Sequence, residues 1–422
     1  MTRATVRLGL RENAAQFSLL VAVNAFVGAM VGLERSTLPL IGREDFGLTS
    51  SAAVLSFITA FGLAKALTNL AAGALADRLG RRRLLIAGWT LALPVPLLIA
   101  IAPTWGWIVA ANALLGVNQG LTWSMTVVMK IDLVGPRRRG LALGLNEAAG
   151  YGGVALAAAA SGWLAAEFAA RDVLAIAGGG IAVVALALSI IFVRDTGGHV
   201  ALEQASARPR DVAQSPPLRG VFADATWRLP ALRSCSQAGL VNNLNDALAW
   251  GLVPLFLAAH GAGPGEIGLV AGIYPAVWGL GQIATGHWSD RMGRKPLIAG
   301  GMFLQAAALA VLAASEGAVA VAAAAATLLG AGTALVYPTL IAAISDAIAP
   351  VARASAVGVY RFWRDSGYVA GGLIAGIVAD RIGYGGAIAV VAGLTAASGL
   401  WVLRDMPSVS AVPADGGPLT SS

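Results

Sequence analysis

The sequence has little charge and few of the residues that soluble enzymes use for chemistry. Only 12% of its 422 residues are charged, whereas soluble globular domains carry about 25%. The single cysteine, Cys235, excludes a disulfide within the chain, and the three histidines fall in loops or at the ends of apolar runs, which argues against a metal site. The three lysines, Lys65, Lys130 and Lys295, stand in no GxxxxGKS/T context, so the chain has no P-loop. We therefore expect no nucleotide-driven pump, no enzyme and no cofactor.

Long apolar runs fill the sequence instead. Hydrophobic residues make up 57% of the chain and the mean hydropathy is +0.74. Runs of roughly 20 residues are long enough to cross a bilayer as helices. They fall at 16–41, 51–75, 84–102, 105–129, 140–166, 173–193, 233–258, 264–288, 296–314, 317–345, 354–378 and 384–403. The sequence predicts an all-α integral membrane protein with twelve transmembrane helices.

The positions of the basic residues predict the orientation. If the N-terminus is cytoplasmic, 22 of the 29 Lys and Arg lie in cytoplasmic segments, three (Arg43, Arg171 and Arg381) lie outside and four lie within spans. This is the positive-inside pattern, and it predicts a multi-pass protein of the cytoplasmic (inner) membrane with both termini cytoplasmic. Basic residues distributed over loops in this way do not form the water-facing patch of a nucleic-acid binder. The polar start TRATVRLGLRENAAQ indicates no cleavable signal peptide.

The second half of the chain repeats the first. GALADRLGRRRLL from Gly73 returns as GHWSDRMGRKPLI from Gly286, 213 residues later, and IDLVGPRRRGLALG from Ile131 returns as SDAIAPVARASAVG from Ser345, 214 residues later. A near-constant offset over several landmarks indicates that six spans were duplicated into two pseudo-symmetric six-helix bundles. The predicted parts are an N-terminal bundle at 1–193, a polar cytoplasmic linker without helical periodicity at 194–232, a C-terminal bundle at 233–405 and a disordered tail at 406–422.

The loop after the second span carries a motif that also returns in the second half. The pattern GxLaDRxGRRxxL is matched at Gly73, Leu75, Asp77, Arg78, Gly80, Arg81, Arg82 and Leu85, and its second copy at Gly286, Asp290, Arg291, Gly293, Arg294 and Lys295. With two such loops in register, the chain resembles the major facilitator superfamily over its whole length apart from tails and linker. The resemblance implies a secondary transporter whose two bundles rock around a central site.

The resemblance also implies a conformational latch at the cytoplasmic surface. Asp77 would face the positive N-terminus of the eleventh helix and hold an outward-open state, while the arginines reach Asp132 at the end of the fourth span. The second copy would repeat this arrangement. The residues expected to take part are Gly73, Asp77, Arg78, Gly80, Arg81, Asp132, Gly286, Asp290, Arg291, Gly293, Arg294 and Asp346. The alternative is that these arginines only anchor the topology in the headgroup region.

Ionisable residues also occur inside the spans. They are Glu34, Arg35, Lys65, Glu147, Asp246, Arg361, Arg364 and Asp365. Together they would cost over about 20 kcal/mol if unpaired, so each needs a partner or water. The second and eleventh helices of the family touch across the interface, and matching depth then predicts the pairs Lys65 with Asp365 and Asn69 with Arg361. Arg364 shares this interface, and Glu147 and Gln282 lie at related depths on the opposite side.

Polar and aromatic residues on several spans predict a small-molecule cavity. Arg361, Arg364, Asp365 and Tyr368 share one face of the eleventh helix. The full expected set is Asn112, Gln119, Trp123, Asn242, Asn245, Asp246, Tyr337, Arg361 and Tyr368. For each amide the alternative is a hydrogen bond between helices.

Without a nucleotide site, transport would be driven by a gradient or would equilibrate the solute. A buried carboxylate can bind and release a proton as access alternates, and the candidates are Glu147, Asp246 and Glu34, in that order. Glu34 adjoins Arg35 near the outer end of its span, where a paired or solvated helix end is the alternative.

The direction of transport is open between two readings. Drug exporters of the family have an arginine where this chain has Gly116 and a GPxxGG motif where it has GYGG at 150–153, which argues against drug antiport. General similarity to shorter efflux members favours proton-coupled export of a small organic solute. The alternatives are a proton symporter importing an organic anion, which the arginine pair favours, and a non-transporting membrane sensor. The expected partners are a small-molecule substrate, protons and the lipid bilayer, and the expected state is a monomer.

Overall fold

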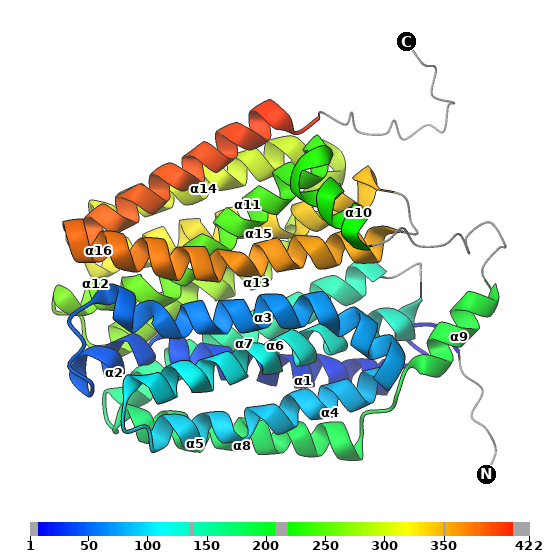
Figure 1. Cartoon of the computed structure of the whole chain (residues 1–422), viewed down its shortest axis with the longest axis horizontal. Helices are drawn as coiled ribbons and strands as arrows, with labels where there is room; N and C mark the ends of the chain where they lie inside the picture. The colour runs from blue at the N-terminus through cyan, green and yellow to red at the C-terminus, as the bar shows by residue number, and fades with distance from the viewer. Residues whose placement is uncertain (1–6, 136–138, 207–217, 349–351, 408–422) are drawn as a thin grey trace.

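The computed structural model describes residues 7–135, 139–206, 218–348 and 352–407. The side chains of Ala74, Asp77, Arg139, Gly140, Gln204, Ala205, Ser206, Gly286, His287, Asp290 and Ala354 are also outside the description. Helices make up almost all of the described chain, and no strand occurs in it (Figure 1). The predicted all-α class is therefore confirmed.

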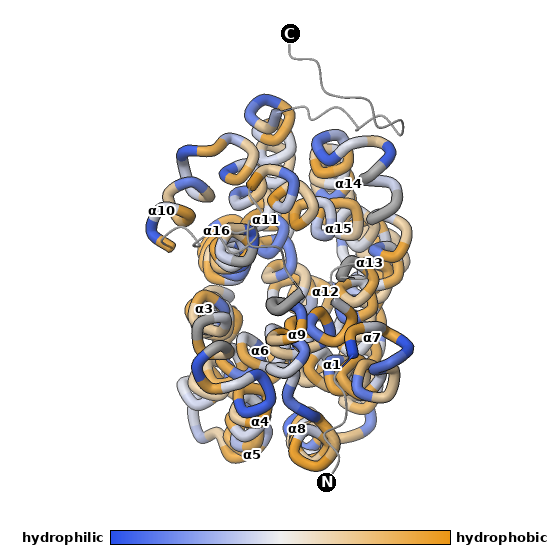
Figure 2. The backbone as a smooth tube through the Cα atoms, turned by 90° about the vertical axis from the view of Figure 1, so that its right-hand side faces the viewer, coloured by the Kyte–Doolittle hydropathy of each residue, from blue (hydrophilic) through white to orange (hydrophobic). Residues whose placement is uncertain are grey.

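The first half of the chain forms one bundle, drawn in blue to green in Figure 1. Its helices are α1 (Ala14–Arg35), α2 (Leu38–Glu44), α3 (Ser51–Leu79), α4 (Arg81–Ala92), α5 (Pro94–Ala100), α6 (Trp105–Val134), α7 (Arg139–Ala165) and α8 (Ala170–Ile191). Pro94 and Pro96 divide the third span into α4 and α5, because proline removes a backbone donor and clashes with the preceding turn. Helices α4, α5 and α8 lie at the edge of the bundle (Figure 2).

The second half forms the other bundle. Its helices are α11 (Pro230–Ala247), η4 (Leu248–Leu252), α12 (Val253–Ala259), α13 (Pro264–Met292), α14 (Arg294–Ala313), α15 (Val319–Ala347) and α16 (Arg353–Asp405). Gly383, with φ of 80°, breaks α16 into two arms, so that it supplies two spans. The short π-helix η4 lies just before Pro254, where the seventh span bends.

The linker between the bundles contains short helices, which the sequence prediction missed. These are α9 (Gly197–Ser206), α10 (Leu218–Ala223) and the π-helical turn η3 (Asp224–Arg228). Thr196, just before α9, donates a 2.6 Å hydrogen bond to Asp132 of α6, and Trp363 of α16 donates to Thr226 of η3 at 3.0 Å. Each helical part of the linker is thus attached to one bundle, and this tertiary contact supplies the stability that local periodicity does not predict.

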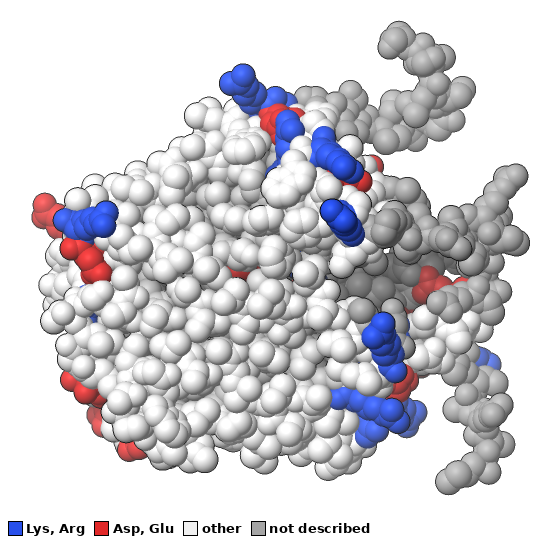
Figure 3. All heavy atoms as spheres, in the orientation of Figure 1, with Lys and Arg blue, Asp and Glu red and all other residues white. Residues whose placement is uncertain are grey.

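The surface of the molecule is that of a membrane protein. Figure 3 shows charged side chains at the two ends and a broad uncharged belt between them. Large apolar side chains on this surface are exposed, such as Leu156 at 76%, Ile176 at 77% and Leu280 at 70%. Within the described chain, nine segments are long and apolar enough to cross a bilayer, one of which contains both arms of α16. Adding the more polar α6 and the α11–α12 segment gives the predicted twelve spans.

The bundles meet along two helix pairs on opposite sides of the centre, α3 with α16 and α7 with α13 (Figure 2). We call the end of the molecule with α9 and α10 the linker end, and the end with α2 and α12 the far end. Near the far end the backbones touch, because a Cβ on Gly162 of α7 would lie 2.5 Å from the Cα of Gly268 on α13. Toward the linker end, a Cβ on Gly144 of α7 or Gly358 of α16 would meet no described atom within 4 Å. Among the described residues, the bundles are therefore packed more tightly at the far end than at the linker end.

Candidate functional site

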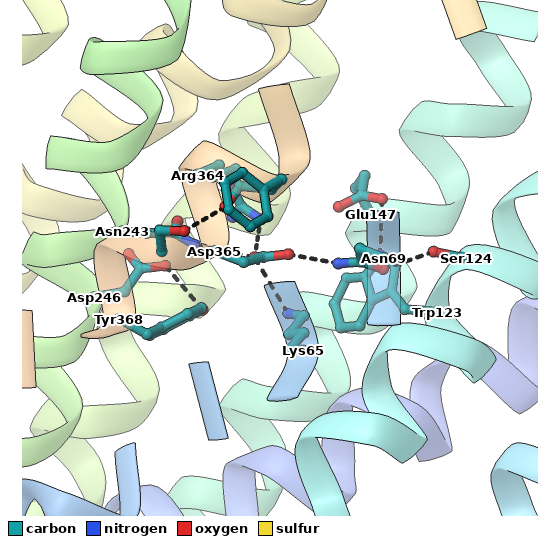
Figure 4. A network of polar contacts seen from close by, with 12 residues as sticks. Lys65, Asn69, Trp123, Ser124, Glu147, Asn243, Asp246, Arg364, Asp365 and Tyr368 are labelled. Atoms are coloured by element: carbon teal, nitrogen blue, oxygen red, sulfur yellow. Dashed lines mark hydrogen bonds and ion pairs between the residues drawn. The ribbon is translucent and has the colours of Figure 1, made fainter. Parts of the chain in front are cut away.

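An ion cluster crosses the interface between the bundles at mid-depth. Lys65 Nζ of α3 lies 3.8 Å from Asp365 Oδ1 of α16, and Arg364 Nη1 lies 3.5 Å from the same oxygen. Asn69 and Asn243 also donate hydrogen bonds to the Asp365 carboxylate (Figure 4). The structure thus brings Lys65 and Asp365 together, as their equal depth predicts.

The expected pairing of Asn69 with Arg361 was wrong, because Asn69 bonds to Asp365 and accepts a 2.9 Å hydrogen bond from Ser124 instead. Lys65 and Asn69 stand at i and i+4 on α3, so they share a face and can both reach one carboxylate. Arg361 lies one turn away on α16.

Arg364 binds across the interface as well. Its Nη2 donates to Tyr151 of α7 at 3.0 Å, and its guanidinium lies 4.3 Å from the ring centroid of Tyr337 and 5.8 Å from that of Trp278. Arg364 is 5% exposed, and its Nε has no hydrogen-bond partner in the described part of the chain. One donor of this cation is therefore available to a ligand.

A small polar cavity lies beside this cluster. Its lining residues are Lys65, Asn69, Trp123, Ser124, Tyr151, Tyr337, Arg361, Arg364 and Asp365. Three are cations and one is a carboxylate, so the lining carries a net positive charge. Trp123, Tyr337 and Arg361 are where the sequence prediction placed them. Aromatic walls with a few convergent charges are typical of a small-molecule site.

Glu147, the first proton-coupling candidate, is buried on α7. Its Oε1 accepts from Trp123 Nε1 at 3.0 Å and from Asn146 at 3.1 Å, whereas Oε2 has no partner among the described residues. Gln282 Nε2 on α13 likewise lacks a partner there.

Asp246 on α11 is fully buried in the second bundle. Its carboxylate accepts hydrogen bonds from Tyr274 and, at 3.2 Å, from Tyr368. No Lys or Arg of the described residues forms an ion pair with Glu147 or Asp246. Both are therefore buried carboxylates held by neutral donors.

The remaining amides of the predicted cavity hold helices together. Gln119 donates to Val27 O of α1 at 2.9 Å and Asn112 to Ile108 O at 3.2 Å. Asn245 donates to Gln305 at 2.9 Å, and Gln305 donates to Asn242 at 3.1 Å. Of the two readings open from the sequence, the hydrogen bond between helices is the observed one for Gln119, Asn242 and Asn245, whereas Asn112 donates to a carbonyl of its own helix.

At the linker end, arginines contact acids within each bundle. Arg81 Nε lies 3.6 Å from Asp132 Oδ2, and Arg294 Nε donates to Asp346 Oδ2 at 2.9 Å. Gly80 and Gly293 form the intervening turns with φ of 90° and 86°. Arg78 and Arg291 are exposed. The surroundings of Asp77, Gly286 and Asp290 fall outside the described structure, so contacts of the latch between the bundles stay a prediction.

Two further features were not predicted as sites. Arg35 is completely buried beside Glu34, which is itself 3% exposed. At the far end, Asp380 of α16 accepts hydrogen bonds from Ser50 Oγ, Ser51 N and Ala52 N at the start of α3. The sequence signals were a cation adjoining an acid inside one span, and a serine pair at the start of another.

A comparison with protein families decides the class of the molecule. The model described as Major Facilitator Superfamily matches residues 17–236 and 236–421. The chain belongs to the major facilitator superfamily. The chain is 37% identical over 92 residues to "Inner membrane transport protein YajR" of Escherichia coli (strain K12), in an alignment that covers 22% of this chain and 19% of that protein.

A solved structure supports the fold of the transporter. The crystal structure of a POT family transporter in complex with a thioalcohol-conjugated peptide superposes with a TM-score of 0.73. The two chains are 12% identical, and the match covers 92% of this chain and 95% of the other. At that identity the likeness establishes the shared fold alone.

Proposed function

We propose that this transporter moves a small organic anion across the membrane by alternating access, coupled to protons. The observation that carries the proposal is the central cavity, where Lys65, Arg361 and Arg364 face a single carboxylate, Asp365. The aromatic walls around it suit an apolar body carrying one anionic group. An anion entering this cavity would bind the free donor of Arg364 and compete with Asp365 for the two nearest cations.

The tight far end and loose linker end correspond to one state of an alternating-access cycle. If the linker end is cytoplasmic, as the basic residues predict, this state faces inward. The Asp380 contacts at the start of α3 then hold the outer side closed. The Asp77 and Asp290 motifs would hold the inner side closed in the opposite state, with the chain acting as a monomer in the inner membrane.

Proton coupling requires a carboxylate that changes protonation as access alternates. Glu147 and Asp246 fit this role because both are buried and bound by neutral donors. Asp365 fits an exchange role, because protonation there would release Lys65 and Arg364 to the substrate. Glu34 lies away from the central cavity and is the weakest of the candidates.

Counterflow into proteoliposomes with a panel of labelled organic acids, amines and neutral solutes tests the proposal. Uptake restricted to acids supports it, and Arg364→Gln should abolish that uptake while Tyr151→Phe, which removes one hydrogen bond to the same guanidinium, raises KM only about two- to tenfold. A folded protein that moves amines or neutral solutes but no acid contradicts the anion assignment. A folded protein that moves nothing on the panel favours the membrane-sensor alternative.

Direction is tested with a pH-sensitive dye in inverted vesicles. Export by antiport brings protons out of the vesicle lumen as the anion enters, whereas a symporter carries both in the same direction. General similarity to efflux members favours export, and the arginine pair in α16 suits anion symport.

A further inference from the structure

A second cationic position lies between the central cavity and the far end. Arg35 ends α1 and is 0% exposed, and none of its guanidinium nitrogens has a hydrogen-bond partner among the described residues. A guanidinium stays charged in proteins and presents five donors in a fixed fork. A buried cation without acceptors is costly, so this position is suited to an anion that the structure does not contain.

Aromatic rings from both bundles enclose this guanidinium. Its carbon lies 5.8 Å from the ring centroid of Phe57 and 4.6 Å from that of Phe61, both on α3 of the first bundle. Trp250, on η4 of the second bundle, is 5.5 Å away. The rings attract the cation without accepting its N–H groups in regular hydrogen bonds. Because these rings belong to both bundles, separation of the bundles at the far end would expose the guanidinium.

The carboxylates nearest to Arg35 do not pair with it. Glu34 lines a separate small cavity with Val95, Pro96 and Leu174 inside the first bundle, on the other side of α1. Asp246 is occupied by Tyr274 and Tyr368. Among the described residues, the guanidinium therefore contacts aromatic rings but forms no ion pair and no hydrogen bond with a carboxylate.

The position lies close to the central cavity. Lys65 Nζ lies 5.5 Å from the centroid of the same Phe61 ring that contacts Arg35. The Tyr368 ring lies beside Lys65 and Phe61. Its centroid is 5.5 Å from Lys65 Nζ and 5.5 Å from the Phe61 centroid. One aromatic side chain thus separates the cation at the far-end side from the cations of the cavity.

We propose that Arg35 is a second binding position for the oxyanion of the substrate, a carboxylate or a phosphate, occupied on the path between the far end and the central cavity. This inference rests on the proposed transport of organic anions. The forked guanidinium binds such an oxyanion through two parallel hydrogen bonds, and Phe57, Phe61 and Trp250 contact the apolar body of the ligand. Phe61 then lies between the two cations where the anion passes from Arg35 to Lys65.

Thermal unfolding of the purified full chain, titrated with three probes, tests this position. Benzoate and phenyl phosphate share a ring and differ in the anionic group, and benzamide is the neutral counterpart of benzoate. We expect wild type to be stabilised by at least one of the two anions and not by benzamide, and the effective anion identifies the preferred group. In Arg35→Gln the apparent affinity for that anion should fall by about tenfold or more.

Arg171→Gln is the matched control. Arg171 is also an arginine at the far end and lies 4.5 Å from the Phe46 ring centroid, but it has its own carboxylate partner, Asp45, at 2.7 Å. Its replacement should leave anion affinity unchanged. A folded Arg35→Gln variant with wild-type affinity overturns the inference.

Arg35→Lys keeps the inference testable if Arg35→Gln does not fold. Lysine retains the charge but not the fork, so we expect a weaker anion affinity by about fivefold, and an unchanged affinity overturns the inference. Anion binding that is lost in Arg364→Gln but retained in Arg35→Gln disproves only the second position. Absence of stabilisation by either anion in wild type, together with no counterflow of acids, disproves the proposed function as well.

Discussion

The Asp380 carboxylate of the second bundle accepts a 2.6 Å hydrogen bond from the Ser50 hydroxyl of the first. The same carboxylate accepts backbone hydrogen bonds from Ser51 and Ala52, so it caps the positive N-terminus of α3. Arg43 adds a 2.9 Å hydrogen bond to the Tyr384 hydroxyl at the same end. These contacts join the bundles at the far end.

Asp380→Ala should shift the transporter toward a state that is open at the far end. We expect a cysteine at Thr59, which faces Gly372 of α16 within this interface, to react about fivefold faster with a membrane-impermeant maleimide, since several partly exposed hydrogen bonds are lost. The background variant is Cys235→Ala. Asp172→Ala, which removes an exposed acid at the same end, is the control, and equal labelling in all three proteins would disprove the role of Asp380.

The ion cluster around Asp365 predicts that replacing Asp365 and replacing Lys65 lower the stability of the protein by different amounts. Asp365→Asn should destabilise the fold more than Lys65→Gln, because Asp365 faces both Lys65 and Arg364. Asp365→Asn leaves uncompensated buried charge at a cost of about 3–5 kcal/mol, whereas Lys65→Gln leaves Asp365 paired with Arg364 and should cost less. The double variant should lose less than the sum of the two, as measured by denaturant titration in micelles. Strict additivity would mean that the ion pair is not energetically coupled.

The two buried carboxylates held by neutral donors predict a change in the pH dependence of transport. Glu147→Gln or Asp246→Asn should flatten the dependence of counterflow on external pH if that residue carries the coupled proton, because an amide cannot bind or release a proton. The change should be accompanied by loss of pH-dependent thermal stabilisation by substrate. A wild-type pH profile in both variants would remove both residues as proton carriers.

The turn between α3 and α4 predicts a stability difference between two glycines. Gly80→Ala should destabilise the protein by about 1–2 kcal/mol, because φ of 90° is strained for any residue with a Cβ. Gly144→Ala, in a helix and with no described atom within 4 Å of the added Cβ, should be neutral or stabilising by up to about 1 kcal/mol. Thermal unfolding of the two variants measures the difference, and a loss in Gly144→Ala as large as in Gly80→Ala would contradict this account.

The fold was accessible from the sequence because the bilayer imposes length and composition on each span. The predicted run at 51–75 corresponds to α3 at Ser51–Leu79, and the run at 264–288 to α13 at Pro264–Met292. The errors in the predicted fold lie in the linker, outside the spans, where the bilayer imposes no length or composition on the chain. The helix α9 at Gly197–Ser206 depends on tertiary contacts that periodicity does not reveal.

The site was accessible only in part. The depth of a residue along a helix follows from counting residues, and equal depth predicted the pairing of Lys65 with Asp365. Counting does not resolve which of two neighbouring turns supplies a donor, so the partner of Asn69 was missed. It also cannot tell whether an amide such as Gln119 faces a cavity or another helix, because a bundle buries both faces. The Asp380 contact joins residues about 330 positions apart, for which the sequence alone gives no pairing signal.

The crossing of Gly162 and Gly268 has a consequence for the membrane gradient. Backbone touches backbone there, so no side chain can rotate away to admit a file of water molecules. Protons move along such files, and a carrier that leaked them would dissipate the energy source that we propose it uses. At this crossing α7 and α13 must separate before water can pass between them, which would link proton entry by this route to the state that also admits the solute.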